Sequence, residues 1–149
     1  AKLLVERGTD FTWYVLGEGE LRPELEGKIK ALGLQKRFIL LGSRSNPYPF
    51  FKNCDLYVQT SRYEGFGITL AEAKMFQKPI VTTNFDAVGA QFVNEENGLI
   101  VDISPKAIAD GIVRMLTDTK LRENCVENVS KEKIGNAEEV EKLYKIIEE

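Results

Sequence analysis

The residues best suited to chemistry lie in one short segment, residues 61–72, which reads SRYEGFGITLAE. Its two glycines, Gly65 and Gly67, let a backbone approach a ligand closely. Helix-forming residues follow, and the free N–H groups and positive dipole end of a helix suit a diphosphate. Glu64, in the loop, can accept hydrogen bonds from sugar hydroxyls. Glu72, in the early turns of the helix, can hold a ribose diol, since a carboxylate accepts from two neighbouring hydroxyls.

A purely structural interpretation of this segment stays open on the residues alone. A glutamate near a helix N-terminus stabilises the helix dipole without any ligand. A glycine-rich segment is often only a turn. The segment is therefore either a ligand site or a simple connection between a strand and a helix.

Short apolar runs alternate with helical patterns along the chain. The apolar runs predict five strands, at residues 11–16, 37–41, 55–59, 79–83 and 99–101. Apolar residues at helical spacing predict helices over residues 21–32 and 69–76, from Ser104 through Leu116, and from about Asn136. Ser104 followed by Pro105 is a favourable helix start. The chain opens within a helix at residues 1–7, and the prolines of residues 43–49 predict a loop.

Strands that are apolar on both faces and alternate with helices indicate an α/β fold, with a Rossmann-like parallel sheet flanked by helices. Ligands of such sheets bind beyond the carboxyl ends of the strands. The candidate ligand loops are therefore residues 17–20, 42–49, 60–67 and 84–89. A doubly wound domain begins with a strand, whereas this chain begins within a helix. We expect residues 1–149 to be an N-terminally truncated fragment that lacks its first strand.

Composition argues against several other functions. With 149 residues, the chain fits one domain or a piece of a larger one. Lys and Arg are scattered and the net charge is -3, so we expect no nucleic-acid partner. No apolar run approaches the ~18–20 residues that span a membrane. The absence of histidine excludes a Cys/His zinc site and a histidine-based triad within the chain. Cys54 and Cys125 are expected to be free thiols of a cytoplasmic protein.

Several motifs together resemble one enzyme family. Residues 64–72, EGFGITLAE, look like the E-x7-E signature of retaining, family-4-type glycosyltransferases of the GT-B fold. Residues 15–20, VLGEGE, resemble the family's strand followed by G-D-G-P, and residues 97–101, NGLIV, resemble its N-G-L-L-V. Weaker similarities occur in the same order at residues 38–42, 54–58 and 78–81. The resemblance covers nearly the whole chain.

The resemblance implies a two-domain enzyme in which this chain is the C-terminal domain that binds the nucleotide-sugar donor. In the family, the first glutamate of the signature contacts the donor sugar and the last holds the ribose. Glu64 is thus implied as the catalytic-site carboxylate, with its exact role open, and Glu72 as the ribose ligand. The backbone between them meets the diphosphate, which implies Gly65, Phe66, Gly67, Ile68, Thr69 and Leu70. Gly17 would lie beside the donor, and Leu41 and Gly42 beside its base.

The implied reaction is transfer of a hexosyl group, with retention of configuration, from a nucleoside-diphosphate sugar to a glycan or lipid-linked acceptor in surface polysaccharide assembly. Retention in the family is attributed to front-face attack assisted by the donor diphosphate. No cofactor and no metal are expected. The acceptor would bind through the missing N-terminal domain, which would also make any contact with the inner face of the membrane. We expect this fragment alone to be inactive, because transfer needs a second domain to position the acceptor and exclude water.

The sequence also departs from the family pattern. The family's Arg and Lys for the diphosphate come from a G-R-L-x-x-x-K-G segment, which would lie upstream of Ala1. Residues 86–91, DAVGAQ, replace the frequent G-G-x-x-E, so sugar contacts from this loop stay open. If the family's strand order holds, the missing strand is central and the sheet is interrupted. A non-catalytic nucleotide-sugar-binding or assembly module is the alternative function. A dinucleotide oxidoreductase is disfavoured because residues 17–22 lack a third glycine and carry two glutamates.

Overall fold

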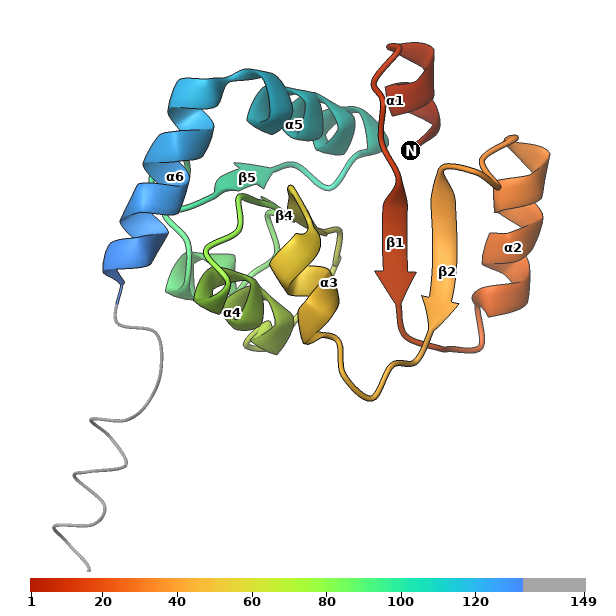
Figure 1. Ribbon diagram of the computed structural model, residues 1–149, viewed down its shortest axis with the longest axis horizontal. Coiled ribbons are helices and arrows are strands. Elements are labelled where there is room, and N and C mark those ends of the chain that lie inside the picture. The colour runs from red at the N-terminus through yellow and green to blue at the C-terminus, as the bar shows by residue number, and fades with distance from the viewer. Residues whose placement is uncertain (133–149) are drawn as a thin grey trace, which may run out of the picture.

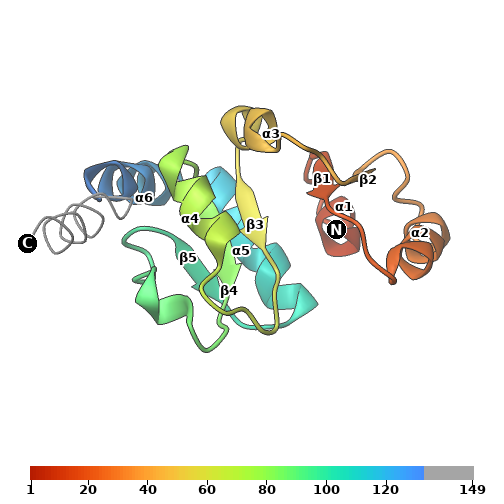
Figure 2. The ribbon, with the colours of Figure 1, turned by 90° about the horizontal axis from the view of Figure 1, so that it is seen from below.

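Short parallel strands alternate with helices, as the sequence predicts, in the computed structural model (Figures 1 and 2), which describes residues 1–132. The strands are β1 (Trp13–Leu16), β2 (Phe38–Gly42), β3 (Tyr57–Gln59), β4 (Ile80–Thr83) and β5 (Leu99–Val101). The helices are α1 (Lys2–Glu6), α2 (Arg22–Ala31), α3 (Tyr48–Asn53), α4 (Ile68–Met75), α5 (Pro105–Thr117) and α6 (Thr119–Lys131), with a 3-10 turn at Val88–Ala90. The helix expected from about Asn136 lies outside the described residues.

The strands belong to two separate parallel sheets. β1 pairs with β2, and β3, β4 and β5 pair in that order. Figure 2 shows β1 and β2 nearly end-on while β3 lies in the plane of the view, so the strands of the two sheets run in different directions. Within residues 1–132, β1 pairs with a strand only on the edge that faces β2, and β3 only on the edge that faces β4. The other edge of each strand has no partner strand in this range. The described strands therefore do not form one continuous sheet.

The hydrophobic core lies on both faces of the three-stranded sheet. All four residues of β4 are buried, and neighbouring residues of a strand point to opposite faces. Val81 packs in a cluster with Leu4 of α1 and with the apolar stripes of α5 and α6. Ile80 packs in a second cluster with Phe51 of α3 and with the buried face of α4. Figure 1 shows α5 on one side of this sheet and α3 and α4 on the other.

The last two described helices begin with side-chain caps. The Ser104 hydroxyl accepts a hydrogen bond from the Ala107 N–H at 3.1 Å, and Pro105 opens α5, which confirms the predicted helix start. The helix α6 was not among the predicted elements. Asp118 caps it by accepting from the Leu121 N–H at 3.0 Å, and Leu121, Cys125 and Val129 form its buried stripe.

The helix predicted over residues 21–32 is confirmed as α2, but its leucines are exposed. Leu21, Leu25 and Leu32 are each at least 40% exposed, and α2 contains no buried residue. The reason is visible in Figure 1, where α2 lies beside the two-stranded sheet alone. Among residues 1–132, no helix is both long enough and apolar enough to cross a membrane.

Candidate functional site

The turn between β3 and α4 depends on a glycine. Gly67 precedes the first helical residue with φ +74° and ψ 58°, a left-handed conformation that favours glycine. A Cβ at this position would lie only 3.1 Å from Leu70 Cδ1. No side chain caps α4, so the first N–H groups of this helix are left without a side-chain acceptor. Such a helix start is suited to binding an anion.

Glu64 is held in this turn by side chains of β3 and of the loop. Its Oε2 accepts from Gln59 Nε2 at 3.1 Å and from the Ser61 hydroxyl at 3.3 Å. The Tyr57 hydroxyl donates to Gln59 Oε1 at 2.7 Å. The half-buried Glu64 carboxylate thus ends a chain of donors that begins on β3.

Tyr57 also relates Glu64 to Glu72. Burial raises the pKa of Tyr57, a hydrogen bond with Thr69 lowers it, and the charges of Glu72 and then Glu64 raise it further. Both carboxylates therefore act on the same phenol. The structure brings the two glutamates of the sequence motif to one site at the carboxyl end of β3, beside the start of α4.

Of the residues between the two glutamates, four are exposed, Gly67 and Leu70 are buried, and Ala71 is half-buried. Gly65, Phe66, Ile68 and Thr69 are exposed. Leu70 is fully buried and its N–H donates to the Gly67 carbonyl at 2.9 Å. Leu70 therefore packs beneath the turn, whereas the exposed residues lie at its surface.

The other predicted donor residues lie on the two-stranded sheet. The Gly17 N–H donates to the Gly42 carbonyl at 3.0 Å, next to Leu41 of β2. Gly42 has φ +74°, and a Cβ there would lie 2.6 Å from Glu18 Oε1. The structure brings Gly17, Leu41 and Gly42 together, but no hydrogen bond described for residues 1–132 joins them to the turn before α4.

Three polar residues that the sequence analysis missed stabilise this turn: Gln59, Thr83 and Gln91. The Thr83 hydroxyl, at the end of β4, donates to the Ser61 carbonyl at 2.5 Å. Gln91 Nε2 donates to the carbonyl of Phe66 and lies 3.5 Å from that of Gly67. Gln91 lies in the segment that departs from the family's G-G-x-x-E, and this departure was the available signal.

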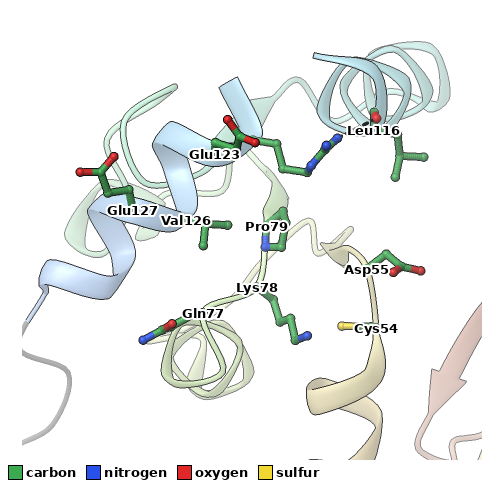
Figure 3. Close-up of a pocket in the computed structure, with 10 residues that line it drawn as sticks. Cys54, Asp55, Gln77, Lys78, Pro79, Leu116, Glu123, Val126 and Glu127 are labelled. Atoms are coloured by element: carbon green, nitrogen blue, oxygen red, sulfur yellow. Dashed lines mark hydrogen bonds between the residues drawn. The ribbon is translucent and has the colours of Figure 1, made fainter. Parts of the chain in front are cut away.

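A separate pocket of about 600 Å³ lies at the opposite ends of the strands (Figure 3). Its lining comes from residues just before β3 and β4 and from the neighbouring parts of α5 and α6. In Figure 3, Cys54, Lys78 and Pro79 are drawn around it. None of the predicted donor residues lines this pocket. The candidate site is thus the turn before α4 and not this pocket.

The cysteines and acidic side chains show no metal-binding arrangement in the described part of the chain. Residues 1–132 contain no group of three or more Cys, Asp or Glu side chains placed to hold a metal ion. Cys54 and Cys125 are free, and burial raises the pKa of both thiols. The expectation that no metal or cofactor is used stays a prediction.

Comparisons with known proteins place the chain in a family. Residues 1–132 match the family described as "Glycosyl transferases group 1". The chain is 34% identical over 116 residues to the N-acetylgalactosamine-N,N'-diacetylbacillosaminyl-diphospho-undecaprenol 4-alpha-N-acetylgalactosaminyltransferase of Campylobacter jejuni, a match that covers 76% of this chain and 32% of the relative. The chain belongs to the group 1 glycosyl transferases.

Solved structures agree on the fold. The C-terminal domain of a group 1 family glycosyl transferase, LpcC of Francisella tularensis, superposes with a TM-score of 0.75 at 32% identity, covering 87% of this chain and 71% of that domain. HepE of Anabaena in complex with UDP-glucose superposes with a TM-score of 0.73 at 27% identity, covering 79% and 34%. The chain has the Rossmann-like α/β fold of GT-B glycosyltransferases and spans about a third of the length of the curated relatives it matches.

Proposed function

We propose that this chain is the donor-binding domain of a retaining glycosyltransferase, which transfers a hexosyl group from a nucleoside-diphosphate sugar to a glycan or lipid-linked acceptor. One observation carries the proposal: the start of α4, which no side chain of residues 1–132 caps, lies between two carboxylates, Glu64 in the preceding loop and Glu72 within the helix. A nucleotide sugar carries a diphosphate between two rings rich in hydroxyls. The turn before α4 can bind the diphosphate, and the carboxylates of Glu64 and Glu72 on either side of it can accept hydrogen bonds from the hydroxyls of the two rings.

The residues take separate roles in this proposal. Glu72 accepts from the ribose hydroxyls, and Glu64 contacts the transferred sugar. The backbone from Gly65 to Thr69 binds the diphosphate, and the glycine pair at Gly17 and Gly42 lies beside the nucleoside. Two comparisons support a nucleotide-sugar donor and a lipid-linked acceptor. HepE was solved with UDP-glucose, and the Campylobacter relative is named for transfer to a diphospho-undecaprenol substrate.

We further propose that residues outside this chain supply a central strand and a second domain. Within residues 1–132, one edge of β1 and one edge of β3 pair with no strand, which supports this proposal because such edges are templates for pairing with another strand. The second domain binds the acceptor and makes any membrane contact, and the Arg and Lys that neutralise the diphosphate come from a segment upstream of Ala1. The chain alone is then inactive. The two free thiols support a cytoplasmic setting, and the reaction uses neither metal nor cofactor.

The test is calorimetric titration of the complete protein with UDP, GDP and ADP. We expect one diphosphate to bind better than the other two, and Glu72→Ala to weaken it about tenfold or more, the effect of losing hydrogen bonds to a charged group. Glu123→Ala, which removes an exposed carboxylate of α6, is the matched control. Binding of no diphosphate would instead support a non-catalytic assembly module. The anomeric configuration of the product, determined by NMR, tests retention separately.

A further inference from the structure

A buried lysine lies on the helix that follows the donor-binding turn. Lys74 of α4 exposes only 7% of its side chain. Its Nζ lies 2.6 Å from Glu132 Oε2 and 4.6 Å from the centre of the Phe92 ring. Burial of an ammonium group is unfavourable unless the group is paired, and even a paired charge rarely stabilises a core more than an apolar residue of similar volume. Stability alone therefore does not account for Lys74.

Lys74 fixes the main chain at Gln91. Its Nζ donates to the Gln91 carbonyl at 2.5 Å. Asn97 Nδ2 donates to the same carbonyl at 3.0 Å and to Glu132 Oε1 at 2.5 Å. The Gln91 carbonyl thus accepts from α4 and from residue 97, and both donors also contact Glu132, the residue that follows α6. Figure 2 shows the segment between β4 and β5 passing beside α4.

The Gln91 side chain acts in turn on the donor-binding turn. Its Nε2 donates to the Phe66 carbonyl and lies 3.5 Å from the Gly67 carbonyl. In a planar trans peptide, the C=O and the following N–H point in opposite directions. The Phe66 carbonyl shares a peptide with the Gly67 N–H, and the Gly67 carbonyl shares one with the Ile68 N–H. Because both carbonyls point toward Gln91, these two N–H groups point away from it. Those N–H groups belong to the backbone that the proposed function assigns to the diphosphate.

We propose that Gln91 is a positioning residue for the donor diphosphate, and that Lys74 holds Gln91 in place. The inference rests on the proposed function, because it concerns the same turn. Gln91 touches no reacting group itself. It orients the peptides that receive the diphosphate, so its removal weakens binding of the diphosphate and not of the nucleoside.

The test compares diphosphates with nucleosides on the complete protein. UDP, GDP and ADP are titrated by calorimetry, and uridine, guanosine and adenosine by NMR. Gln91→Met keeps the length of the side chain but removes the amide donor. Gln35→Met makes the same change at an exposed glutamine in the turn after α2. We expect Gln91→Met to weaken the preferred diphosphate about tenfold, the typical effect of one hydrogen bond, with nucleoside affinity within twofold of wild type and Gln35→Met unchanged.

A second variant, Lys74→Met, tests the support of Gln91. We expect it to weaken diphosphate binding in the same direction as Gln91→Met. If Lys74→Met does not fold, the comparison of Gln91→Met with Gln35→Met tests the role of Gln91 by itself.

The remaining outcomes overturn the inference in distinguishable ways. If Gln91→Met binds the diphosphate as tightly as wild type while Glu72→Ala binds it weakly, Gln91 does not position the diphosphate. The donor site of the proposed function is then still supported. Equal weakening of nucleoside and diphosphate assigns Gln91 a structural role only. If the wild-type protein binds none of the three diphosphates, the proposed function fails and the inference fails with it.

Discussion

The amide of Gln59 donates to the carboxylate of Glu64 across 3.1 Å. The Tyr57 hydroxyl donates to the other end of that amide at 2.7 Å. The phenol therefore fixes the orientation of the amide, with Nε2 toward Glu64. β3 thus supplies a donor chain that holds a carboxylate of the candidate site in place.

The first prediction concerns this donor to Glu64. Replacing Gln59 by methionine removes the N–H while keeping the side-chain length. We expect kcat/KM for sugar transfer by the complete protein to fall about tenfold to a hundredfold, because hydrogen bonds to charged groups contribute ~1.5–3 kcal/mol. Tyr57→Phe leaves the amide in place but frees its orientation, so its effect is smaller. Wild-type kcat/KM in Gln59→Met would show that Glu64 needs no support from β3.

Two neighbouring glycines offer a matched pair for the second prediction. Gly67 has φ +74°, and its Cβ would lie 3.1 Å from Leu70 Cδ1, whereas a Cβ on Gly65 meets nothing within 4 Å. We expect Gly67→Ala to lower the free energy of unfolding by about 1–2 kcal/mol and to weaken diphosphate binding. Gly65→Ala changes stability by less than about 0.5 kcal/mol. Urea denaturation and calorimetry of both variants measure the difference, and equal effects would contradict the assigned backbone geometry.

The third prediction concerns the ionisation of Tyr57. Burial raises the pKa of this phenol, and Glu72 and Glu64 raise it further. Since the pKa is higher in the folded protein than in the unfolded chain, the stability linked to neutral Tyr57 is complete below the usual tyrosine pKa of about 10 and is lost as the pH rises above it. We expect the free energy of unfolding to fall less steeply above that pH in Tyr57→Phe.

Absorbance titration checks the same assignment directly. We expect Tyr57→Phe to remove a phenol that ionises above the usual tyrosine pKa of about 10. Tyr63→Phe, at a side chain that is 89% exposed, is the control. If Tyr57→Phe instead removes a phenol that ionises at or below a pH of about 10, the two glutamates do not act on Tyr57 as described.

The sequence predicts the strands and the two glutamates of the candidate site, and each prediction has a physical reason. Buried parallel strands need apolar residues on both faces, so each is visible as a short apolar run. Glu64 and Glu72 are visible because charged side chains flank a glycine turn at a helix start. The sequence does not predict the helix α6, although Leu121, Cys125 and Val129 have helical spacing. The residues between these three are mostly charged or polar, so the apolar face of α6 is narrow and its periodicity is weak.

The support of the site could not be predicted from local patterns. Gln91 binds the backbone carbonyl of Phe66, 25 residues earlier, and Lys74 pairs with Glu132, 58 residues later. A main-chain carbonyl has the same chemistry whatever its side chain, so residue types give no signal for the first contact. The second depends on where the end of α6 lies relative to α4, which the spacing of residues within either helix does not determine.

The last prediction concerns the open edges of β1 and β3. The Trp13 N–H donates to the Arg37 carbonyl and the Tyr57 N–H to the Pro79 carbonyl. Since alternate residues of a strand direct their N–H groups to opposite edges, the N–H groups of Tyr14 and Val58 face the unpaired edges. If a strand from outside this chain pairs there, these two amides exchange rapidly in the 149-residue chain and are protected at least about a hundredfold in the complete protein. Hydrogen exchange followed by NMR makes the comparison, with Val81 of the paired strand β4 as the internal reference. Equal exchange of Tyr14 and Val58 in both proteins would rule out a strand inserted between the sheets.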